Sequence, residues 1–337
     1  MIGQRTGAYT TLPTRIVSID VMRAVSMLYI VGFWHLLDYT DVRQWHHNSA
    51  TYRLTVTALS LFVLISGFLA GRKDGALVAG DFWKFYKTRL WRIYFPFVIA
   101  ASLFLVSGLD DIVSLIKGVA LVAMLLAPPP FTLWFVSMII LFYMVAPLLI
   151  SLRSYGVIYL GVCSAIILAM ILYQAETSRM DMRLLIYFPC FAAGIFLAGG
   201  TLPSSRVTLI RLQLLAVMSL VPTFARSSAG LETDPWAAPW AFFGSIAFFT
   251  VVMYVGRNLR VHAIVIALSE ASYFMYLLHR PIYLWMRTIW FPSNEKEQIF
   301  YLLFVCLPII GIVAWLGQRA YMSLFQSDKF RVAAASA

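Results

Sequence analysis

Ionisable side chains occur inside segments that are otherwise apolar, and their types suit proton transfer and anion binding. The first apolar segment contains Asp20, Arg23 and His35. On a helix, Arg23 lies at about −60° and His35 at about +60° from Asp20, so the three side chains share one broad face. Imidazole is the usual general base near neutral pH, and ionisable groups within a membrane segment are functional candidates. The alternative is that Asp20 and Arg23 extend to the membrane interface while His35 meets the outer headgroups.

A second set of polar side chains shares one face of the helix expected over residues 264–289. At about 100° per residue, all its members fall within about 40° of Ser272: Ser272, Tyr276, His279 and Tyr283. This stripe fits hydrogen bonding between helices together with an interfacial tyrosine belt, or contact with a bound substrate. Glu270 lies about 160° from the stripe, so we do not expect it in the same pocket.

Basic and aromatic residues are mixed in the segment 81–96. Its cations include Lys87, Arg89 and Arg92. Guanidinium groups bind phosphates through paired N–H donors, so one interpretation is that the segment holds an anionic ligand. The other interpretation is that these cations anchor the segment at the cytoplasmic membrane surface.

The sequence does not favour metal or disulfide chemistry. Three cysteines lie within apolar runs without CxxC spacing, which favours a packing role: Cys163, Cys190 and Cys306. His46 and His47 follow Asp38 in an outer loop, and we do not expect a metal site there.

The elements that position these residues must be membrane helices. The 337-residue chain is 61% hydrophobic and 12% charged, and its mean hydropathy is +0.82. Soluble domains carry roughly 25% charged residues, so lipid is the natural solvent and partner of this chain. The formal charge of +11 does not indicate a nucleic-acid partner, because Lys and Arg lie in short loops where they orient membrane helices. The N-terminus is polar to about Arg15, which argues against a cleavable signal peptide.

We predict an all-α, polytopic transmembrane bundle of about ten crossings, since a crossing helix needs about 20 apolar residues. Residues 15–322 form a single transmembrane domain, between a cytoplasmic N-terminal segment (1–14) and a cytoplasmic C-terminal tail (323–337). The predicted crossings lie near 16–37, 54–70, 91–108, 131–152, 156–173, 184–200, 207–224, 237–256, 264–289 and 299–320.

An eleventh apolar run, 112–127, is short and is followed by three prolines. The strongly basic loop 71–92 must be cytoplasmic, and so must the N-terminus. If the run crossed the bilayer, Arg257 and the basic C-terminal tail would lie on the outer side of the membrane. Without that crossing they lie on the cytoplasmic side, which basic segments favour. We therefore predict that 110–130 is a re-entrant or interfacial helix and that both termini are cytoplasmic.

Four stretches, in this order, resemble the membrane-bound acyltransferase family 3, and the resemblance extends over about residues 14–322. The matching stretches are Ser18–Val25; Leu61–Leu69 with the following Arg89–Pro96; Thr132–Ser137 with Phe142, Tyr143 and Pro147; and Ser272–Pro281. The resemblance implies transfer of an acyl group, usually acetyl from acetyl-CoA, to a hydroxyl of a cell-envelope sugar or polysaccharide precursor. It also implies a multi-pass protein of the bacterial inner membrane. The alternative function is a proton-coupled secondary transporter.

The resemblance also implies roles for individual residues. His35 would act as general base or carry the acyl group, in a catalytic group with Arg23 and Asp20. The acyl-CoA would be bound by Arg89, Arg92, Lys87 and Trp134. The acceptor substrate would be bound by Tyr276, Ser272 and Ser66, and His279 would either bind the acceptor or assist the reaction. No metal is implied.

One spacing departs from the family pattern. Eleven residues separate Arg23 from His35, one more than is usual, because Trp34 occupies the usual place of the histidine. A separation of twelve positions turns His35 by about 120° from Arg23 on a regular helix, whereas eleven positions would leave the two within about 20°. A π-bulge would bring His35 back to the same face as Arg23, and Gly32 lowers the energetic cost of such an irregularity. Without a bulge, His35 points elsewhere.

Overall fold

The structure is a computed structural model that describes residues 15–40, 47–72, 79–200, 205–227, 229–256 and 262–335. Within these ranges the chain forms helices and turns and no β-strand, as the prediction of an all-α fold requires. The predicted N-terminal segment 1–14 lies outside the described residues, as do His46 and Arg257.

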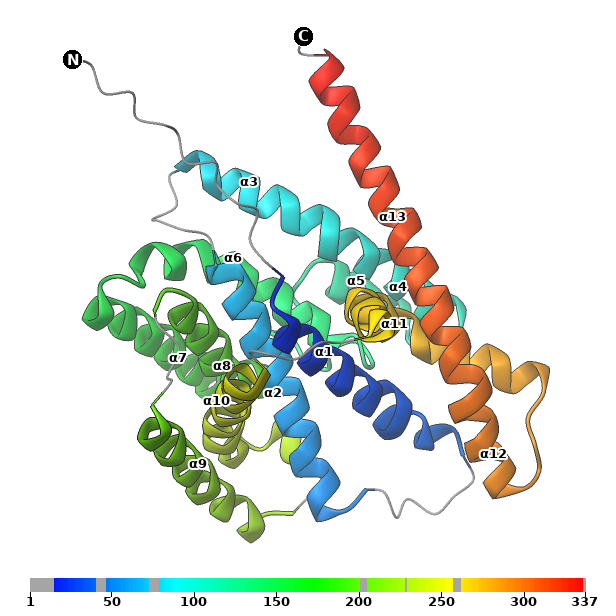
Figure 1. Cartoon of the computed structure of the whole chain (residues 1–337), viewed down its shortest axis with the longest axis horizontal. Helices are drawn as coiled ribbons and strands as arrows, with labels where there is room; N and C mark the ends of the chain where they lie inside the picture. The colour runs from blue at the N-terminus through cyan, green and yellow to red at the C-terminus, as the bar shows by residue number, and fades with distance from the viewer. Residues whose placement is uncertain are drawn as a thin grey trace.

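Helices follow one another along the whole described chain (Figure 1). In order they are α1 (Val17–Tyr29), α2 (Ser49–Gly71), α3 (Ala79–Arg89), α4 (Phe95–Val106), α5 (Ile112–Val119), α6 (Trp134–Leu152), α7 (Gly156–Thr177), α8 (Arg183–Ala198), α9 (Arg206–Leu220), α10 (Ala238–Val255), α11 (Ala263–Ile289), α12 (Glu295–Tyr301) and α13 (Leu307–Ala335). Three π-helical segments join neighbouring pieces: η1 (Ile30–His35) follows α1, η3 (Leu90–Tyr94) joins α3 to α4, and η8 (Leu302–Cys306) joins α12 to α13. Short 3-10 turns are η2 (Leu37–Tyr39), η4 (Val221–Ala225), η5 (Leu231–Thr233) and η6 (Pro235–Ala237).

Eight helical units of the described chain are long and apolar enough to cross a membrane. The 16-residue α8 and the 27-residue α11 occupy the two remaining predicted spans, 184–200 and 264–289. The protein is therefore a multi-pass membrane protein built from helices. The count of ten crossings and the sides of the two termini stay predictions.

The segment predicted not to cross contains only one short helix. The eight residues of α5 span about 12 Å, far less than the roughly 30 Å of a bilayer core. The end of α5 and the chain that follows are both tied to neighbouring elements. The Tyr94 hydroxyl donates to the Val119 carbonyl at 2.8 Å, and the Asp181 amide donates to the Met124 carbonyl at 2.9 Å. Its irregular backbone is thus held against protein, where non-helical chain is tolerated at membrane depth.

Two glycines allow α2 and α8 to approach until their backbones touch. A Cβ added at Gly67 would lie 2.1 Å from the Phe191 carbonyl oxygen, and one added at Gly194 would lie 2.1 Å from the Leu64 carbonyl oxygen. Small residues are the usual means of close helix packing in membranes, because lipid provides no hydrophobic drive for helix association. The resulting pair α2/α8 is the rigid support on which Ser66 is placed.

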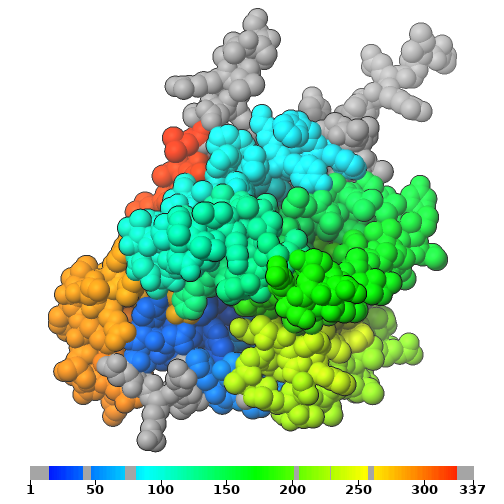
Figure 2. All heavy atoms as spheres, turned by 180° about the vertical axis from the view of Figure 1, so that it is seen from behind, coloured from blue at the N-terminus to red at the C-terminus, as the bar shows by residue number. Residues whose placement is uncertain are grey.

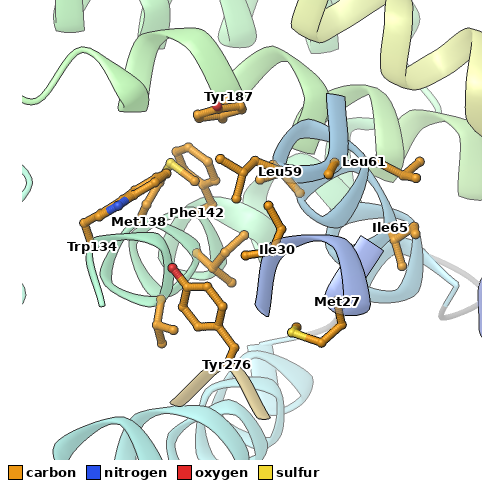
Figure 3. Packing of buried hydrophobic residues seen from close by; sticks show 14 of the residues in the cluster. Met27, Ile30, Leu59, Leu61, Ile65, Trp134, Met138, Phe142, Tyr187 and Tyr276 are labelled. Atoms are coloured by element: carbon orange, nitrogen blue, oxygen red, sulfur yellow. The ribbon is translucent and has the colours of Figure 1, made fainter. Parts of the chain in front are cut away.

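The first helix lies inside the bundle, between α2 and α11 (Figure 1). From the opposite side, later parts of the chain cover most of it (Figure 2). Its apolar residues Met27 and Ile30 join Tyr276 of α11 and Trp134 of α6 in the packed core (Figure 3). Polar side chains of α1 and η1 are therefore surrounded by protein rather than by lipid.

Candidate active site

Arginines gather around one cavity in the described part of the bundle. This arginine cavity has a volume of about 510 Å³ and is lined by Arg23, Arg89 and Arg92, together with one carboxylate, Glu270. Three of the predicted substrate-binding residues also line it: Ser66, Ser272 and Tyr276. Arg89 and Arg92, the predicted acyl-CoA ligands, line the same cavity. Glu270 lines it too, although it was not expected in the pocket of Ser272.

Arg89 is held in place by aromatic rings. Its guanidinium carbon lies 4.8 Å from the ring centre of Phe85 and 4.9 Å from that of Tyr143. Its Nε is buried and has no hydrogen-bond partner, which leaves a donor at the cavity for a ligand. Lys87, in contrast, is exposed on α3 and does not line the cavity.

Arg23 reaches the arginine cavity from α1, and its guanidinium donates a 2.8 Å hydrogen bond to the Ser272 hydroxyl. Asp20, one turn earlier, is buried and does not line this cavity. Its carboxylate accepts hydrogen bonds from Arg15 and from the Ser269 hydroxyl, both at 2.6 Å. Asp20 therefore ties α1 to α11 and lines neither of the two cavities.

A π-helix places His35. The segment η1 begins at Ile30, contains Gly32 and ends at His35. The wider π-helical turn accommodates the extra residue between Arg23 and His35, as a π-bulge would. His35 consequently faces α11, the same helix that Arg23 contacts.

His35 forms a hydrogen-bonded pair with His279. The Nδ1 of His35 lies 2.8 Å from the Nε2 of His279, and the ring planes differ by only 4° with centres 4.8 Å apart. Two imidazoles in this arrangement meet edge to edge through their nitrogens. The Nδ1 of His279 lies 2.8 Å from the Tyr276 carbonyl oxygen, so both of its nitrogens are engaged within the protein.

His279 itself is wholly buried and lines neither cavity. The role of His279 as an acceptor ligand stays a prediction; in this structure its ring has no accessible surface. The polar stripe on α11 instead serves mainly to join that helix to α1 and η1. Its hydrogen bonds to this segment are Ser272 with Arg23, His279 with His35, and Tyr283 with the Val31 carbonyl.

His35 lines the second cavity, which we call the histidine cavity and which has a volume of about 440 Å³. Its wall includes the segment 128–132 and Trp134. Trp134 was expected beside the acyl-CoA arginines, but it lines this cavity instead. Its ring packs against Arg183, whose guanidinium carbon lies 3.9 Å from the ring centre.

The charged groups of the histidine cavity are arranged in opposite-sign pairs. Arg280 donates to Asp38 at 2.9 Å, and Arg183 lies 3.9 Å from Glu232. Arg183 is also bound by Asp181, with contacts of 2.7 and 2.8 Å. Burial raises the pKa of the Glu232 carboxyl, so its attraction to Arg183 fades at a higher pH than for an exposed glutamate.

One hydrogen-bond donor in this cavity has no partner. The Nε of Arg280 is buried without an acceptor, while the guanidinium lies between the rings of Tyr39 (5.4 Å) and Phe131 (5.0 Å). An oxygen of a bound molecule could accept this hydrogen bond. Arg280 is thus a candidate that sequence reasoning missed, although it directly follows His279 in a quoted motif.

Tyr276 lines both cavities. Its hydroxyl donates to the Thr132 carbonyl at 2.5 Å, which fixes the ring at the boundary between them. Trp134 and Phe135 are sequence neighbours, yet the first lines the histidine cavity and the second the arginine cavity. The two cavities therefore lie next to each other near the start of α6, with Tyr276 in the wall of both.

The geometry combines an arginine-rich cavity with a cavity that contains an imidazole. A family model described as an acyltransferase domain matches residues 16–317. The chain belongs to this family, the membrane acyltransferase family 3. No match to the chain was found among curated proteins or among solved structures.

Every residue predicted for the site lies within the part of the chain that matches the acyltransferase family. The same is true of the residues that sequence reasoning missed: Arg183, Glu232 and Arg280. Ionisable residues close to apolar spans were the available signal for these. Within the described residues, no three His, Cys, Asp or Glu side chains are grouped so as to hold a metal ion.

Proposed function

We propose that this acyltransferase moves an acetyl group from acetyl-CoA to a hydroxyl of a cell-envelope sugar or polysaccharide precursor. The single observation that carries the proposal is the pair of neighbouring cavities that share Tyr276 in their walls. One is rich in guanidinium groups and the other contains His35. In this scheme the arginine cavity opens to the cytoplasm, and the protein resides in the bacterial inner membrane.

The arginine cavity suits a polyanionic acyl donor. Coenzyme A carries several phosphate charges, and three guanidiniums line the cavity against the single carboxylate of Glu270. That carboxylate is itself paired with Arg15 at 2.7 Å. Arg89 and Arg92 would bind phosphates, since guanidinium N–H groups match phosphate oxygens. The acyl end of the molecule would extend past Arg23 toward Tyr276.

The histidine cavity suits an uncharged acceptor that carries hydroxyl groups. Its cations are already paired with carboxylates, so it offers no surplus positive charge for an anionic acceptor. The unpartnered Nε of Arg280 would donate to an oxygen of the acceptor or to the developing oxyanion.

The chemical step requires one proton acceptor. The free nitrogen of His35 would remove the proton of the acceptor hydroxyl as its oxygen bonds to the acyl carbon. The carbon–sulfur bond then breaks, and the thiolate of coenzyme A leaves and takes up a proton. General base catalysis of this kind contributes about 10²- to 10⁴-fold. In the two-step alternative the same nitrogen would carry the acyl group, so both routes depend on His35.

No observation favours the proton-coupled transporter, so we do not propose it. The direct test of the acyl-donor site is calorimetric titration of the detergent-purified protein with acetyl-CoA and with CoA. We expect saturable binding that Arg89→Ala/Arg92→Ala abolishes. Lys87→Ala is the matched control, because this exposed cation does not line the cavity; it should bind as the wild type does. Absence of binding up to millimolar acetyl-CoA would refute the proposed donor.

A further inference from the structure

The buried histidine of α11 has a hydrogen-bond arrangement that determines where protons lie on His35. A backbone carbonyl can only accept a hydrogen bond, so the Nδ1 of His279, 2.8 Å from the Tyr276 carbonyl, must carry a proton. A neutral imidazole has one N–H, and the Nε2 of His279 is then an acceptor. The Nδ1 of His35, 2.8 Å away, must therefore donate.

This assignment requires His279 to be neutral. Its side chain is wholly buried, and among the described residues neither imidazole of the pair forms a hydrogen bond to a carboxylate. The nearby charged group is the guanidinium of Arg280, the next residue along the chain, which disfavours a second positive charge. A neutral His279 leaves His35 with its proton on Nδ1 and with Nε2 unprotonated.

We propose that His279 is a positioning residue that holds His35 in the Nδ1–H tautomer and orients its ring, so that the unprotonated Nε2 serves the histidine cavity. The catalytic part of this inference rests on the proposed function. The tautomer itself depends only on the three groups Tyr276, His279 and His35. Without an acceptor at position 279, His35 can carry its proton on Nε2, and the base is then blocked; a buried partner has this role in other imidazole-based sites.

The tautomer can be measured without any assay of activity. The chain has five histidines, so ¹⁵N-histidine-labelled protein in lipid gives a solid-state NMR spectrum simple enough to assign, with His35→Gln identifying the His35 signals. We expect protonated Nδ1 and unprotonated Nε2 for His35. In His279→Leu this preference should be lost, whereas His279→Gln should keep it, because the amide oxygen can accept from Nδ1. Protonated Nε2 on His35 in the wild type overturns the inference.

Thiol release from acetyl-CoA, with water as acceptor, gives the second readout. His279→Leu should lower kcat by about 10- to 100-fold, part of the general-base contribution, with an unchanged KM for acetyl-CoA. His279→Gln should stay within about threefold of the wild type. Equal kcat for the Leu and Gln variants overturns the positioning role. If the wild type releases no thiol, the proposed function fails, and the NMR result still decides the tautomer.

Discussion

The guanidinium of Arg23 and the hydroxyl of Ser272 are joined by a 2.8 Å hydrogen bond across the contact between α1 and α11. The two residues line the arginine cavity side by side. The bond fixes the direction of a cation that no carboxylate within hydrogen-bond distance neutralises in the described chain. The contribution of the Arg23 charge can therefore be tested by mutating Arg23, and the contribution of its position by mutating Ser272.

Replacing Arg23 by Gln removes the charge. We expect kcat/KM for acetyl-CoA in the thiol-release assay to fall by roughly 10- to 100-fold, because a hydrogen bond to a charged group contributes about 1.5–3 kcal/mol. Ser272→Ala keeps the charge and loses only its anchor, so we expect a loss of about tenfold or less. Ser272→Thr retains the hydroxyl and should match the wild type. A greater loss in Ser272→Ala than in Arg23→Gln contradicts this ordering.

The two cavities should be reachable from opposite sides of the membrane. Tyr52 lines the histidine cavity and Ser66 the arginine cavity. Both belong to α2, about 21 Å apart along its axis. The three native cysteines are buried, so background labelling is low. In oriented vesicles, an impermeant maleimide should label Tyr52→Cys only from the outside and Ser66→Cys only from the cytoplasmic side.

Acetyl-CoA should protect Ser66→Cys from the maleimide, but not Tyr52→Cys. Ser66 shares its cavity with the three arginines, whereas Tyr52 lies in the other cavity. Labelling of both positions from one side, or equal protection of both, contradicts the two-sided arrangement.

Stability should depend on the close contact between α2 and α8. Gly67→Ala places a Cβ against the Phe191 carbonyl oxygen, and backbone cannot move aside as a flexible side chain can. We expect a loss of about 1–3 kcal/mol of unfolding free energy, seen as a lower melting temperature in detergent. Gly161 on α7 is exposed and has no neighbour within 4 Å of an added Cβ. Gly161→Ala should therefore melt at or slightly above the wild-type temperature, because Ala favours the helix over Gly.

Several features of the site could be predicted because they depend on helical periodicity. The stripe of Ser272, Tyr276 and His279 was expected from their angular positions, and its members do lie on one buried face of α11. The single surplus residue before His35 left two alternatives, a π-bulge near Gly32 or a His35 that points elsewhere, and η1 is a π-helix. Both inferences concern residues on one helix, where the number of residues between two positions determines the angle between their side chains around the helix axis.

Other features depend on which helices pack together and on how deeply a residue is buried. Helical periodicity predicts neither. Trp134 and Phe135 lie about 100° apart on α6, and that rotation assigns them to different cavities. The burial of His279 depends on the packing of α1 against α11. The pairing of Arg280 with Asp38 joins residues 242 positions apart, and no spacing rule connects them.

In the proposed mechanism, His35 performs the chemistry of an acyl transfer from acetyl-CoA. The most direct measurement is thiol release by purified His35→Gln, together with calorimetric binding of acetyl-CoA. His262→Gln is the matched control, since His262 is exposed at the start of α11. We predict wild-type binding for both variants, wild-type turnover for His262→Gln, and turnover reduced by about 10²- to 10⁴-fold for His35→Gln. Wild-type turnover by His35→Gln would contradict the account.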